Sequence, residues 1–447
     1  MPTKKFPSFT NKKVLIFGLG QLGRGIKDAI FFAKRGAKVV VTDLKTAEQL
    51  ETSLSKLEGL DITYRLGEHR EEDFDWADLI IRNAAVPVSS PYLQYALKKG
   101  KRVEMDESMF AKYCPCKIIG ITGTRGKSTT TTLIGKILEH NKDLLGIRKV
   151  FVSGNLQGEA TLPLIDEATA DDIVVLELSS WQLQGFGAEK ISPHIAVFTN
   201  LFPDHLNYYK TMEEYGADKK NIFLFQRKRD YCVFNELNDY TKKIAVEAPG
   251  IVRWFSKKDV PKKWQLKLIG AHNLENIAAA MAVGKIMGLT RQEMEIPVSE
   301  FSGLEHRLEF VRAVNNITFI NDTTSTTPIA GQKALSSIDS PIILIAGGAA
   351  KNLALTDFAK DIAQKVKAVV LLEGSATDEL EREIKTFNGE HLILGRFKDF
   401  HEAIGRAYAQ ALPGDTILLS PGCASFGMFK NEFDRGEQFK RLVNQIK

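Results

Sequence analysis

Short apolar runs rich in valine and isoleucine alternate with stretches of helical periodicity along most of the chain. This alternation is typical of α/β folds with largely parallel sheets. The runs predict strands at 14–17, 39–42, 78–82, 117–122, 173–178, 194–199, 317–321, 341–346, 367–372 and 415–419, and the periodic stretches predict helices at about 22–35, 127–140, 212–226 and 273–287. In the final helical stretch, Phe439 and Leu442 share one face, which predicts that they lie in a core.

Three segments, each opened by a strand, organise this pattern into domains. The 447 residues are enough for two to four domains. We expect a Rossmann-like first domain over 1–113, which closes near a Cys-Pro-Cys sequence, and a central domain over 114–303 with the doubly wound sheet of P-loop ATPases. A Rossmann-like third domain is expected over 304–447.

Composition narrows the class of protein. Sixty lysine and arginine residues against 55 acidic ones give a formal net charge of +5 without a long basic block, so nucleic acid is a poor candidate ligand. The four cysteines lack the spacing of a zinc site, which favours reduced thiols. Neither an export signal nor an apolar run near the ~20 residues of a membrane span is visible. We therefore expect a cytoplasmic monomer that acts on an anionic small molecule and contacts no membrane.

A glycine-rich sequence follows the first predicted strand. Gly18, Gly20 and Gly23 are spaced as Gly-x-Gly-x-x-Gly before a helix, and Asp43 stands twenty residues after Gly23. Glycines in this setting let the backbone approach a diphosphate, and the helix N-terminus attracts its negative charge. The sequence also fits an ordinary tight turn, so it predicts a nucleotide diphosphate site without specifying NAD.

The firmest motif is Thr122-Gly-Thr-Arg-Gly-Lys-Ser-Thr129, which lies between a predicted strand and a predicted helix. The usual P-loop has glycine at the place of Ile121, so this loop is a shortened variant. Its backbone amides are expected to surround phosphate, with Lys127 at the terminal phosphates and the Ser128 hydroxyl on Mg²⁺. The motif therefore predicts an ATP site and chemistry at the γ-phosphate.

Charged residues follow the later strands of the same domain. Glu177 ends an apolar strand in the sheet of the phosphate loop, where a carboxylate can hold Mg²⁺, although a strand-end glutamate taken alone is more often solvated. Asp204 and His205 follow the strand at 194–199 and are candidates for binding metal or orienting a nucleophile. Lys219 stands fourteen residues after His205 and, taken alone, has the pattern of a surface lysine.

Further polar groups lie at helix starts and strand ends in the rest of the chain. Asn273 is a candidate N-cap, and Asn276, in the first helical turn, is a candidate contact to adenine. Four groups in the third domain follow predicted strands, on the edge where doubly wound sheets bind ligands. They span 305–307, 321–328, 346–351 and 420–431. Their common position predicts a second face of one active site.

In combination these motifs resemble the Mur ligase family, the ATP-dependent enzymes that form amide bonds in peptidoglycan precursor synthesis. The resemblance covers nearly the whole chain and rests on the order Gly-Thr-x-Gly-Lys-Ser-Thr, Glu-Leu-Ser-Ser, Asp-His-Leu-Asn, a helix lysine, His-Asn-x-x-Asn, His-Arg, Asn-Asp and Gly-Gly-x-x-Lys. The N-terminal glycine loop and the ending Leu-Ser-Pro-x-Cys-Ala-Ser-Phe-x-x-Phe-Lys-Asn are similar to the branch that adds D-glutamate to UDP-N-acetylmuramoyl-L-alanine. The resemblance implies these two substrates, with ATP and Mg²⁺ as cofactors.

The resemblance also implies roles for the motif residues. The implied contacts to the UDP substrate are Gly18, Gly20, Gly23 and Asp43, and Asn155 is implied to touch substrate or phosphate. The implied D-glutamate contacts are Thr326, Lys351, Ser425 and Phe429. The implied ATP contacts are Gly123, Thr124, Arg125, Gly126, Lys127, Ser128, Thr129, Asn276, Arg307 and Asp322. The implied catalytic set is Lys127, Glu177, His205 and Lys219, and the implied Mg²⁺ ligands are Ser128, Glu177, His205 and Lys219. In the family this last lysine is carbamylated by CO₂, which turns an ammonium into an oxygen ligand.

Several positions depart from the family pattern. Arg125 replaces the usual asparagine of the ATP loop, and Arg82-Asn-Ala-Ala-Val-Pro87 stands where Ser-Pro-Gly-Ile/Val-Pro is common. Thr324 and Tyr208 also differ from residues found in some members, and Asn431-Glu-Phe433 exchanges the order Asn-Phe-Glu. None of these changes removes a residue that the chemistry needs.

The implied reaction passes the γ-phosphate to the carboxylate of the L-alanine end, after which the D-glutamate amine attacks the acyl phosphate. The protein contributes mainly positioning and charge neutralisation to such a reaction. Three alternatives remain open. The first is another ligase of the superfamily, such as an L-alanine-adding or folylpolyglutamate-type enzyme. The second is a nicotinamide oxidoreductase, which would leave the ATP loop without a role. The third is a non-catalytic nucleotide-binding regulator.

Overall fold

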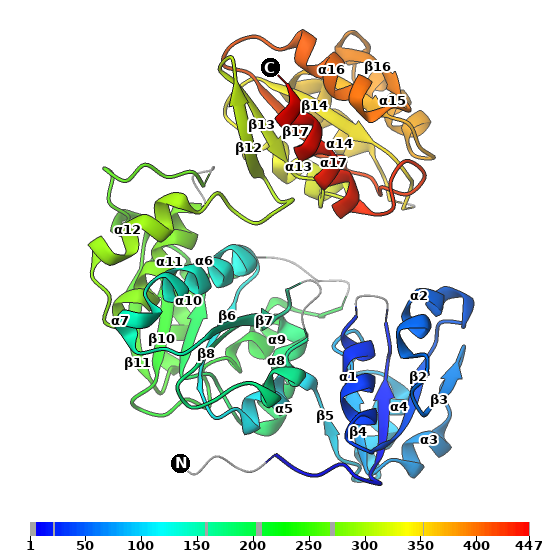
Figure 1. The fold of residues 1–447 in the computed structure, drawn as a ribbon, viewed down its shortest axis with the longest axis vertical. Helices are drawn as coiled ribbons and strands as arrows, with labels where there is room; N and C mark the ends of the chain where they lie inside the picture. Colours follow the sequence, from blue (N-terminus) through cyan, green and yellow to red (C-terminus); the bar gives the residue numbers. More distant parts are fainter. Residues whose placement is uncertain are drawn as a thin grey trace. The chain divides into compact units, whose positions relative to one another are not determined.

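The computed structural model contains three sheets in chain order, each flanked by helices (Figure 1). It describes residues 6–20, 23–156, 160–202, 208–268, 273–351 and 353–446. The paired strands run parallel, with the exception of one antiparallel pair at the edge of the third sheet. The predicted fold class, α/β with three successive sheets, is therefore confirmed.

The first sheet has the strand order β3-β2-β1-β4-β5. Its strands are β1 (Lys13–Phe17), β2 (Lys38–Asp43), β3 (Ile62–Leu66), β4 (Leu79–Arg82) and β5 (Val103–Glu104), and its helices are α1 (Arg24–Ala33), α2 (Glu51–Leu54), α3 (Glu71–Trp76), α4 (Pro91–Lys98) and α5 (Asp106–Tyr113). Side chains alternate along a strand, so Val14 and Ile16 enter one apolar cluster while Leu15 and Phe17 enter another. Burial on both faces explains why these runs are continuously apolar.

The middle sheet has the order β11-β10-β9-β6-β8-β7. Its strands are β6 (Lys117–Thr122), β7 (Val150–Gly154), β8 (Ile173–Glu177), β9 (Ile195–Phe198), β10 (Tyr231–Asn235) and β11 (Ile251–Phe255). Strand β6 is central, with β8 on one side and β9 on the other. The chain order changes direction at this strand, and ligands of open α/β sheets bind at such a switch point.

The helices of this part are α6 (Lys127–His140), α7 (Lys142–Leu145), α8 (Ser180–Glu189), α9 (Met212–Lys220), α10 (Asp239–Ile244), α11 (Asn273–Ile286) and α12 (Arg291–Glu300). Helix α6 has the predicted limits, but the predicted helix at 212–226 is too long, because α9 ends at Lys220. The adjacent side chains of Ile222 and Phe223 are both fully buried. They lie in a turn that follows α9, and both belong to the apolar cluster of unit 1.

The third sheet has the order β12-β13-β17-β14-β15-β16. Its elements are β12 (Glu309–Val314), β13 (Ile317–Asn321), α13 (Pro328–Leu335), β14 (Ile342–Gly347), α14 (Thr356–Lys365), β15 (Val366–Leu372), α15 (Thr377–Thr386), β16 (Ile393–Phe397), α16 (Phe400–Gln410), β17 (Thr416–Leu419) and α17 (Glu432–Gln445). As predicted, Phe439 of α17 is fully buried in a core, and Leu442 is partly buried against the same cluster.

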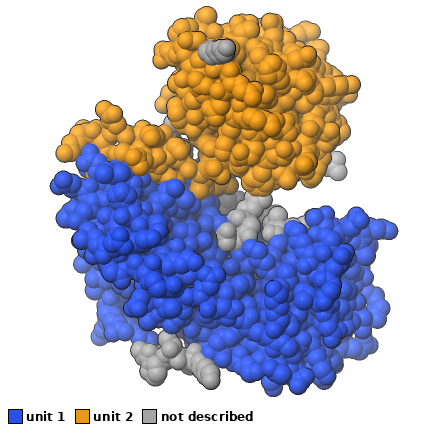
Figure 2. Space-filling view, in the orientation of Figure 1, with its two compact units in different colours: residues 1–261, 275–297 blue, residues 262–274, 298–447 orange. Residues whose placement is uncertain are grey.

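The chain separates into two compact units (Figure 2). Unit 1 comprises 1–261 and 275–297 and contains the first two sheets, while unit 2 comprises 262–274 and 298–447 and contains the third. One apolar cluster in unit 1 includes Phe31, Phe110 and Phe186, so the first and middle sheets share a core. The three domain limits given by the sequence stay a prediction. In the described part of the chain, no helix combines the length and apolar character that crossing a membrane requires.

Candidate active site

The phosphate-binding loop lies at the carboxyl end of β6. Gly123 and Gly126 have φ angles of +146° and +79°, which residues with side chains rarely adopt. Lys127 opens α6, and its Nζ donates to the carbonyls of Gly123 and Thr124 at 3.0 and 3.1 Å. The first turn of α6, all of it described, carries no acidic residue. Helix amides and a lysine thus present positive charge to the loop, which suits an anion such as phosphate.

Two residues that follow β9 hold this loop in place. The Asn200 carbonyl accepts from the Thr124 amide, and Asn200 Oδ1 accepts from the Arg125 amide, both at 2.9 Å. Thr199 Oγ1 donates to the Arg125 carbonyl at 2.7 Å. The sequence analysis did not predict this role for Thr199 and Asn200, because it interpreted their segment as a metal-binding one. The available signal was two polar residues directly after an apolar strand of the same sheet.

Arg125, one of the residues that depart from the family pattern, has an exposed side chain. Its guanidinium carbon lies 5.7 Å from the ring centroid of Phe202, which is also exposed. Because Thr199 and Asn200 bond only to its backbone, the loop conformation does not depend on this side chain. The substitution therefore adds a positive charge on the outer side of the loop.

Lys219 is brought to the loop by α9 and is nearly completely buried, with 1% of its surface exposed. Its Nζ donates to the Gly123 carbonyl at 2.9 Å and lies 4.7 Å from the ring centroid of Tyr215. A buried amine is costly and marks a functional position more often than a solvated one. The surface pattern of a lone helix lysine therefore does not describe this residue.

Glu177 ends β8 at the position that pairs with Ile121 of β6, immediately before the loop. The side chain is buried, and its Oε1 accepts from Asn155 Nδ2 at 2.9 Å. Its Oε2 has no hydrogen-bond partner among the described residues. A buried carboxylate oxygen without a donor suits a cation, so the residues present fit Mg²⁺. His205, another predicted ligand, lies outside the described residues.

Asn276 of α11 packs against the same loop. A Cβ placed on Gly126 would lie 2.1 Å from Asn276 Oδ1, which also accepts from Thr130 Oγ1 at 3.5 Å. Asn276 is thus held between the loop and α6 within unit 1. This placement supports a role at the nucleotide, and the adenine contact itself stays a prediction.

The glycine loop of the first sheet is braced by Asp43. Asp43 Oδ2 accepts from the amides of Leu19 and Gly20 at 2.9 and 3.0 Å, and Ser53 Oγ donates to the Gly20 carbonyl at 3.0 Å. Gly18 and Gly23 flank this contact at the start and end of the loop. In the structure, Asp43 therefore shapes the loop itself, and its predicted contact to uracil stays a prediction.

Arg82, at the end of β4, connects this sheet to the middle one. The buried guanidinium donates to the Val86 carbonyl at 2.8 Å and to Gln184 Oε1 at 2.6 Å. Gln184 Nε2 in turn donates to Asp218 Oδ2 at 2.7 Å. Burial raises the pKa of Asp218 above its ordinary value, against the hydrogen bonds that it accepts. Arg82, which differs from the family pattern, is thus linked through Gln184 to Asp218, the residue that precedes Lys219.

In unit 2, the predicted nucleotide contact Asp322 follows β13 and is buried. Its Oδ2 accepts from Ser420 Oγ at 2.8 Å and its Oδ1 accepts from the Leu308 amide at 3.1 Å. Burial raises the pKa of Asp322 to about 6, although these bonds and the charge of Arg307 oppose the shift. The carboxylate therefore ties together the ends of β13 and β17 and the segment that precedes β12.

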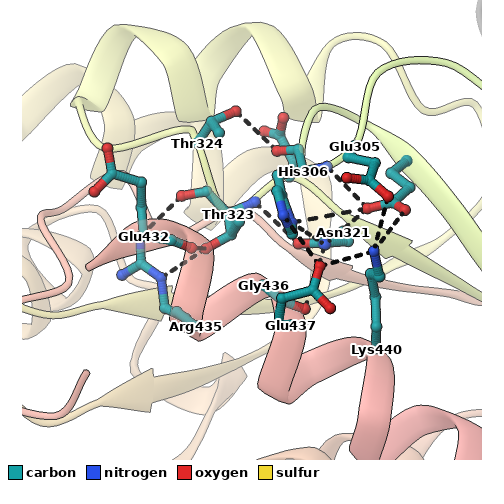
Figure 3. A network of polar contacts seen from close by, with 12 residues as sticks. Glu305, His306, Asn321, Thr323, Thr324, Glu432, Arg435, Gly436, Glu437 and Lys440 are labelled. Carbon is teal, nitrogen blue, oxygen red and sulfur yellow. Dashed lines mark hydrogen bonds and ion pairs between the residues drawn. The ribbon is translucent and has the colours of Figure 1, made fainter. Parts of the chain in front are cut away.

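The loop after Asn321 is held by a network that joins predicted site residues to Arg435, which no sequence motif included (Figure 3). Arg435 of α17 is fully buried, and it donates through Nε to Thr323 Oγ1 and through Nη2 to the Thr323 carbonyl, both at 2.9 Å. Asn321 Nδ2 lies 3.0 Å from His306 Nδ1, and Thr324 Oγ1 donates to the His306 carbonyl at 2.8 Å. An arginine on a final amphipathic helix gives no sequence signal for this role.

One acidic group in the network has the spacing of a cation site. Glu305, His306 and Glu437 lie within reach of a shared ion. Figure 3 shows Lys440 paired with this group. Its Nζ lies 2.9 Å from Glu437 Oε1 and 3.4 Å from Glu305 Oε1. The positive charge at this position therefore comes from the chain's own lysine.

The predicted D-glutamate contacts have different surroundings in unit 2. Lys351 Nζ donates to Thr326 Oγ1 at 2.8 Å, so these two residues are brought together. Ser425 is buried, and its Oγ has no hydrogen-bond partner among the described residues. The Phe429 ring packs on Phe400 with centroids 4.9 Å apart, which makes it a core residue as much as a candidate contact.

Three family models match successive parts of the chain. They are the Mur ligase MurD-like N-terminal domain over 12–104, the Mur ligase middle domain over 121–259 and the Mur ligase glutamate ligase domain over 306–423. The chain belongs to the Mur ligase family. Curated relatives include the UDP-N-acetylmuramoylalanine–D-glutamate ligases of Roseiflexus sp. (42% identity; 97% of this chain, 99% of the relative) and Clostridium tetani (35%; 99% and 98%). Within the family it is a MurD-type ligase, and hence an enzyme.

Solved structures of other Mur ligases have the same fold. The UDP-N-acetylmuramate-alanine ligase MurC of Thermotoga maritima aligns with a TM-score of 0.58 at 18% identity, covering 97% of this chain and 100% of that one. The MurF ligase of Thermotoga maritima, solved in complex with ADP, aligns with a TM-score of 0.54 at 17% identity, covering 99% and 98%. At these identities the likeness concerns the fold alone.

Proposed function

We propose that this chain uses ATP to join D-glutamate to UDP-N-acetylmuramoyl-L-alanine, forming an amide bond in peptidoglycan precursor synthesis. The observation that carries the proposal is the convergence at one sheet edge of the phosphate loop, the buried Lys219 and the open oxygen of Glu177. The substrates follow from the curated relatives, which align over almost their entire length. We further propose that the enzyme works in the cytoplasm as a monomer.

The middle sheet supplies the groups that act on phosphate. The loop amides and Lys127 hold the transferred phosphoryl group, since both present positive charge at the end of β6. Ser128 and Glu177, together with His205 and Lys219, would hold Mg²⁺, which neutralises phosphate charge when bound. Asn155 keeps Glu177 directed at the site through its 2.9 Å hydrogen bond.

Lys219 needs a chemical change to serve a cation. Its amine lies in a buried position beside the loop, where a positive charge would repel a metal ion. Addition of CO₂ to the unprotonated amine forms a carbamate and releases a proton, which replaces the ammonium by two oxygens with one negative charge.

The remaining residues position the two substrates. The glycine loop with Asp43 is the candidate site for the UDP part, because it opens the helix α1 at the carboxyl edge of the first sheet. In unit 2, Lys351 and Thr326 offer an ammonium and a hydroxyl, which suit the carboxylates of D-glutamate. Attack of the D-glutamate amine on the acyl phosphate then forms the amide and releases phosphate.

The test is phosphate release from ATP with substrates added singly and together. Release should require both UDP-N-acetylmuramoyl-L-alanine and D-glutamate, and Lys127→Met should lower the rate by about 100-fold or more, in the range seen when one electrostatic stabiliser is removed. Lys136→Met, an exposed lysine of the same helix, is the matched control and should leave the rate unchanged. Release with UDP-N-acetylmuramate and L-alanine instead would refute the proposal in favour of the alanine-adding branch.

A further inference from the structure

Arg24 bridges the first and middle sheets of unit 1. It is the first residue of α1 and follows the glycine loop directly. Its Nη2 donates to the Gly154 carbonyl at 2.8 Å and to Asn155 Oδ1 at 3.1 Å, where β7 ends. None of the motifs found in the sequence includes this arginine, yet its side chain reaches the segment that contacts Glu177.

The contact with Arg24 determines the orientation of the Asn155 amide. Asn155 Oδ1 accepts from Arg24, and Asn155 Nδ2 donates to Glu177 Oε1 at 2.9 Å. The reversed amide would direct its NH₂ group at the guanidinium and its oxygen at the carboxylate, which gives two repulsive contacts. Arg24 therefore selects the orientation in which Asn155 donates to Glu177.

Asn155 in turn fixes which oxygen of Glu177 is available. The Asn155 amide donates to the Glu177 carbonyl at 2.7 Å, so backbone and side chain both hold the glutamate. With Oε1 engaged by Asn155, Oε2 is the buried oxygen that has no hydrogen-bond partner among the described residues. The chain Arg24, Asn155, Glu177 thus ends at one oxygen that is open to a cation.

A charge pair with Glu107 is the simpler explanation of Arg24. Arg24 Nη1 lies 3.5 Å from Glu107 Oε1, which is longer than the ~2.7–2.9 Å of a strong charge-assisted hydrogen bond. The contact with the Gly154 carbonyl, at 2.8 Å, has the shorter distance. Glu107 is fully buried and also accepts from Gln182 Nε2. Glu107 thus attracts the guanidinium, while the shorter contact of Arg24 is its hydrogen bond to the Gly154 carbonyl at the end of β7.

We propose that Arg24 is a positioning residue for a divalent cation, and that it acts through Asn155 to keep Glu177 Oε2 directed at the cation. The inference rests on the proposed function, in which Glu177 is a cation ligand. As a consequence, a side chain of α1, beside the first sheet, influences how tightly the site at the end of β8 binds a cation.

The test measures cation binding directly, with Mn²⁺ as the probe and a non-hydrolysable ATP analogue present, by electron paramagnetic resonance of free Mn²⁺. Arg24→Met should weaken Mn²⁺ binding by about 10-fold, the lower end for loss of a residue that orients a ligand. Because Arg24 acts through Asn155, the double variant with Asn155→Ala should bind no more weakly than Asn155→Ala alone. Lys34→Met, an exposed basic residue at the other end of α1, should bind as the wild type does.

A second set of variants separates positioning from charge neutralisation. Arg24→Met combined with Glu107→Gln removes the unpaired buried charge but restores no donor to Asn155, so weak Mn²⁺ binding should persist. Recovery of wild-type binding in this double variant would overturn the inference. So would unchanged Mn²⁺ binding in Arg24→Met with a native circular dichroism spectrum, or a change confined to the KM of the UDP substrate. Failure of the wild type to bind Mn²⁺ would refute the proposed function and this inference with it.

Discussion

Replacing Gly126 by alanine should disturb the phosphate loop in two separable ways. The φ angle of +79° costs a residue with a side chain about 1–2 kcal/mol. The new Cβ would lie 2.1 Å from Asn276 Oδ1, so Asn276 must move and lose its contact with Thr130, which costs about 1 kcal/mol more. If the full 2–3 kcal/mol falls on the nucleotide complex, the ATP concentration for half-maximal phosphate release rises by about 30- to 150-fold.

The assay compares Gly126→Ala with a variant that has an unfavourable positive φ angle but no steric overlap of the new Cβ. Gly146 has a φ angle of +64°, and no atom lies within 4 Å of a Cβ placed there, so Gly146→Ala isolates the backbone cost. Gly126→Ala should lower the thermal midpoint further than Gly146→Ala, and adding Asn276→Ala should recover part of the difference. Equal midpoints for the two alanine variants, or no recovery without the Asn276 side chain, would refute the reasoning.

Three further results are expected. Lys219→Ala should nearly abolish turnover, and a short carboxylic acid should partly restore it, whereas Lys220→Ala, at the adjacent ion-paired lysine, should retain activity in a phosphate-release assay. Burial raises the pKa of Asp322 to about 6, so the folded state binds its proton more tightly than the unfolded state, and the stabilisation present at low pH is lost as the pH rises through 6. Relative to Asp322→Asn, the unfolding free energy should therefore fall by about 3 kcal/mol between pH 3 and pH 7 in denaturant titrations. A hydrogen bond from Cys116 lowers the pKa of Cys114, so iodoacetamide should alkylate Cys114 first, as read by peptide mass spectrometry.

Each of these results has a clear contrary outcome. Full activity of Lys219→Ala without an additive would refute the carbamate. A pH dependence of stability that Asp322→Asn does not alter would assign the titration to other groups. Labelling of Cys116 before Cys114 would contradict both the burial of Cys116 and the lowered pKa of Cys114.

The sequence predicted the phosphate loop and ten of the strands, because these have local signals. The strands that it did not predict are β3, β5, β7, β10, β11, β12 and β16. An apolar run that ends in a glycine-rich turn predicted the limits of β6 and α6 as the structure has them. Strand β3 escapes the pattern because Ile62–Leu66 alternates apolar and polar side chains at the sheet edge. Strand β12, the antiparallel neighbour of β13, has charged residues within it and no β-branched run.

The parts of the site that the sequence did not predict depend on contacts between distant residues. Asn200 supports a loop 75 positions earlier in the chain, and Arg435 holds a threonine 112 positions earlier. The burial of Lys219 follows from the placement of α9 against β6, which no local periodicity encodes. Arg24 carries no motif, since its role exists only where α1 meets the end of β7.

A shared core and polar bridges fix the spacing between the first and middle sheets of unit 1. Phe31, Phe110 and Phe186 lie in one cluster, and Arg24 and Arg82 span the same pair of sheets. The distance from the glycine loop to the phosphate loop is therefore set by packed side chains and not by a flexible linker. On the proposed function, a substrate anchored at the glycine loop would need the correct length to bring its carboxylate to the phosphate loop. On the proposed function, the fixed span between the two loops would by itself discriminate against shorter or longer precursors.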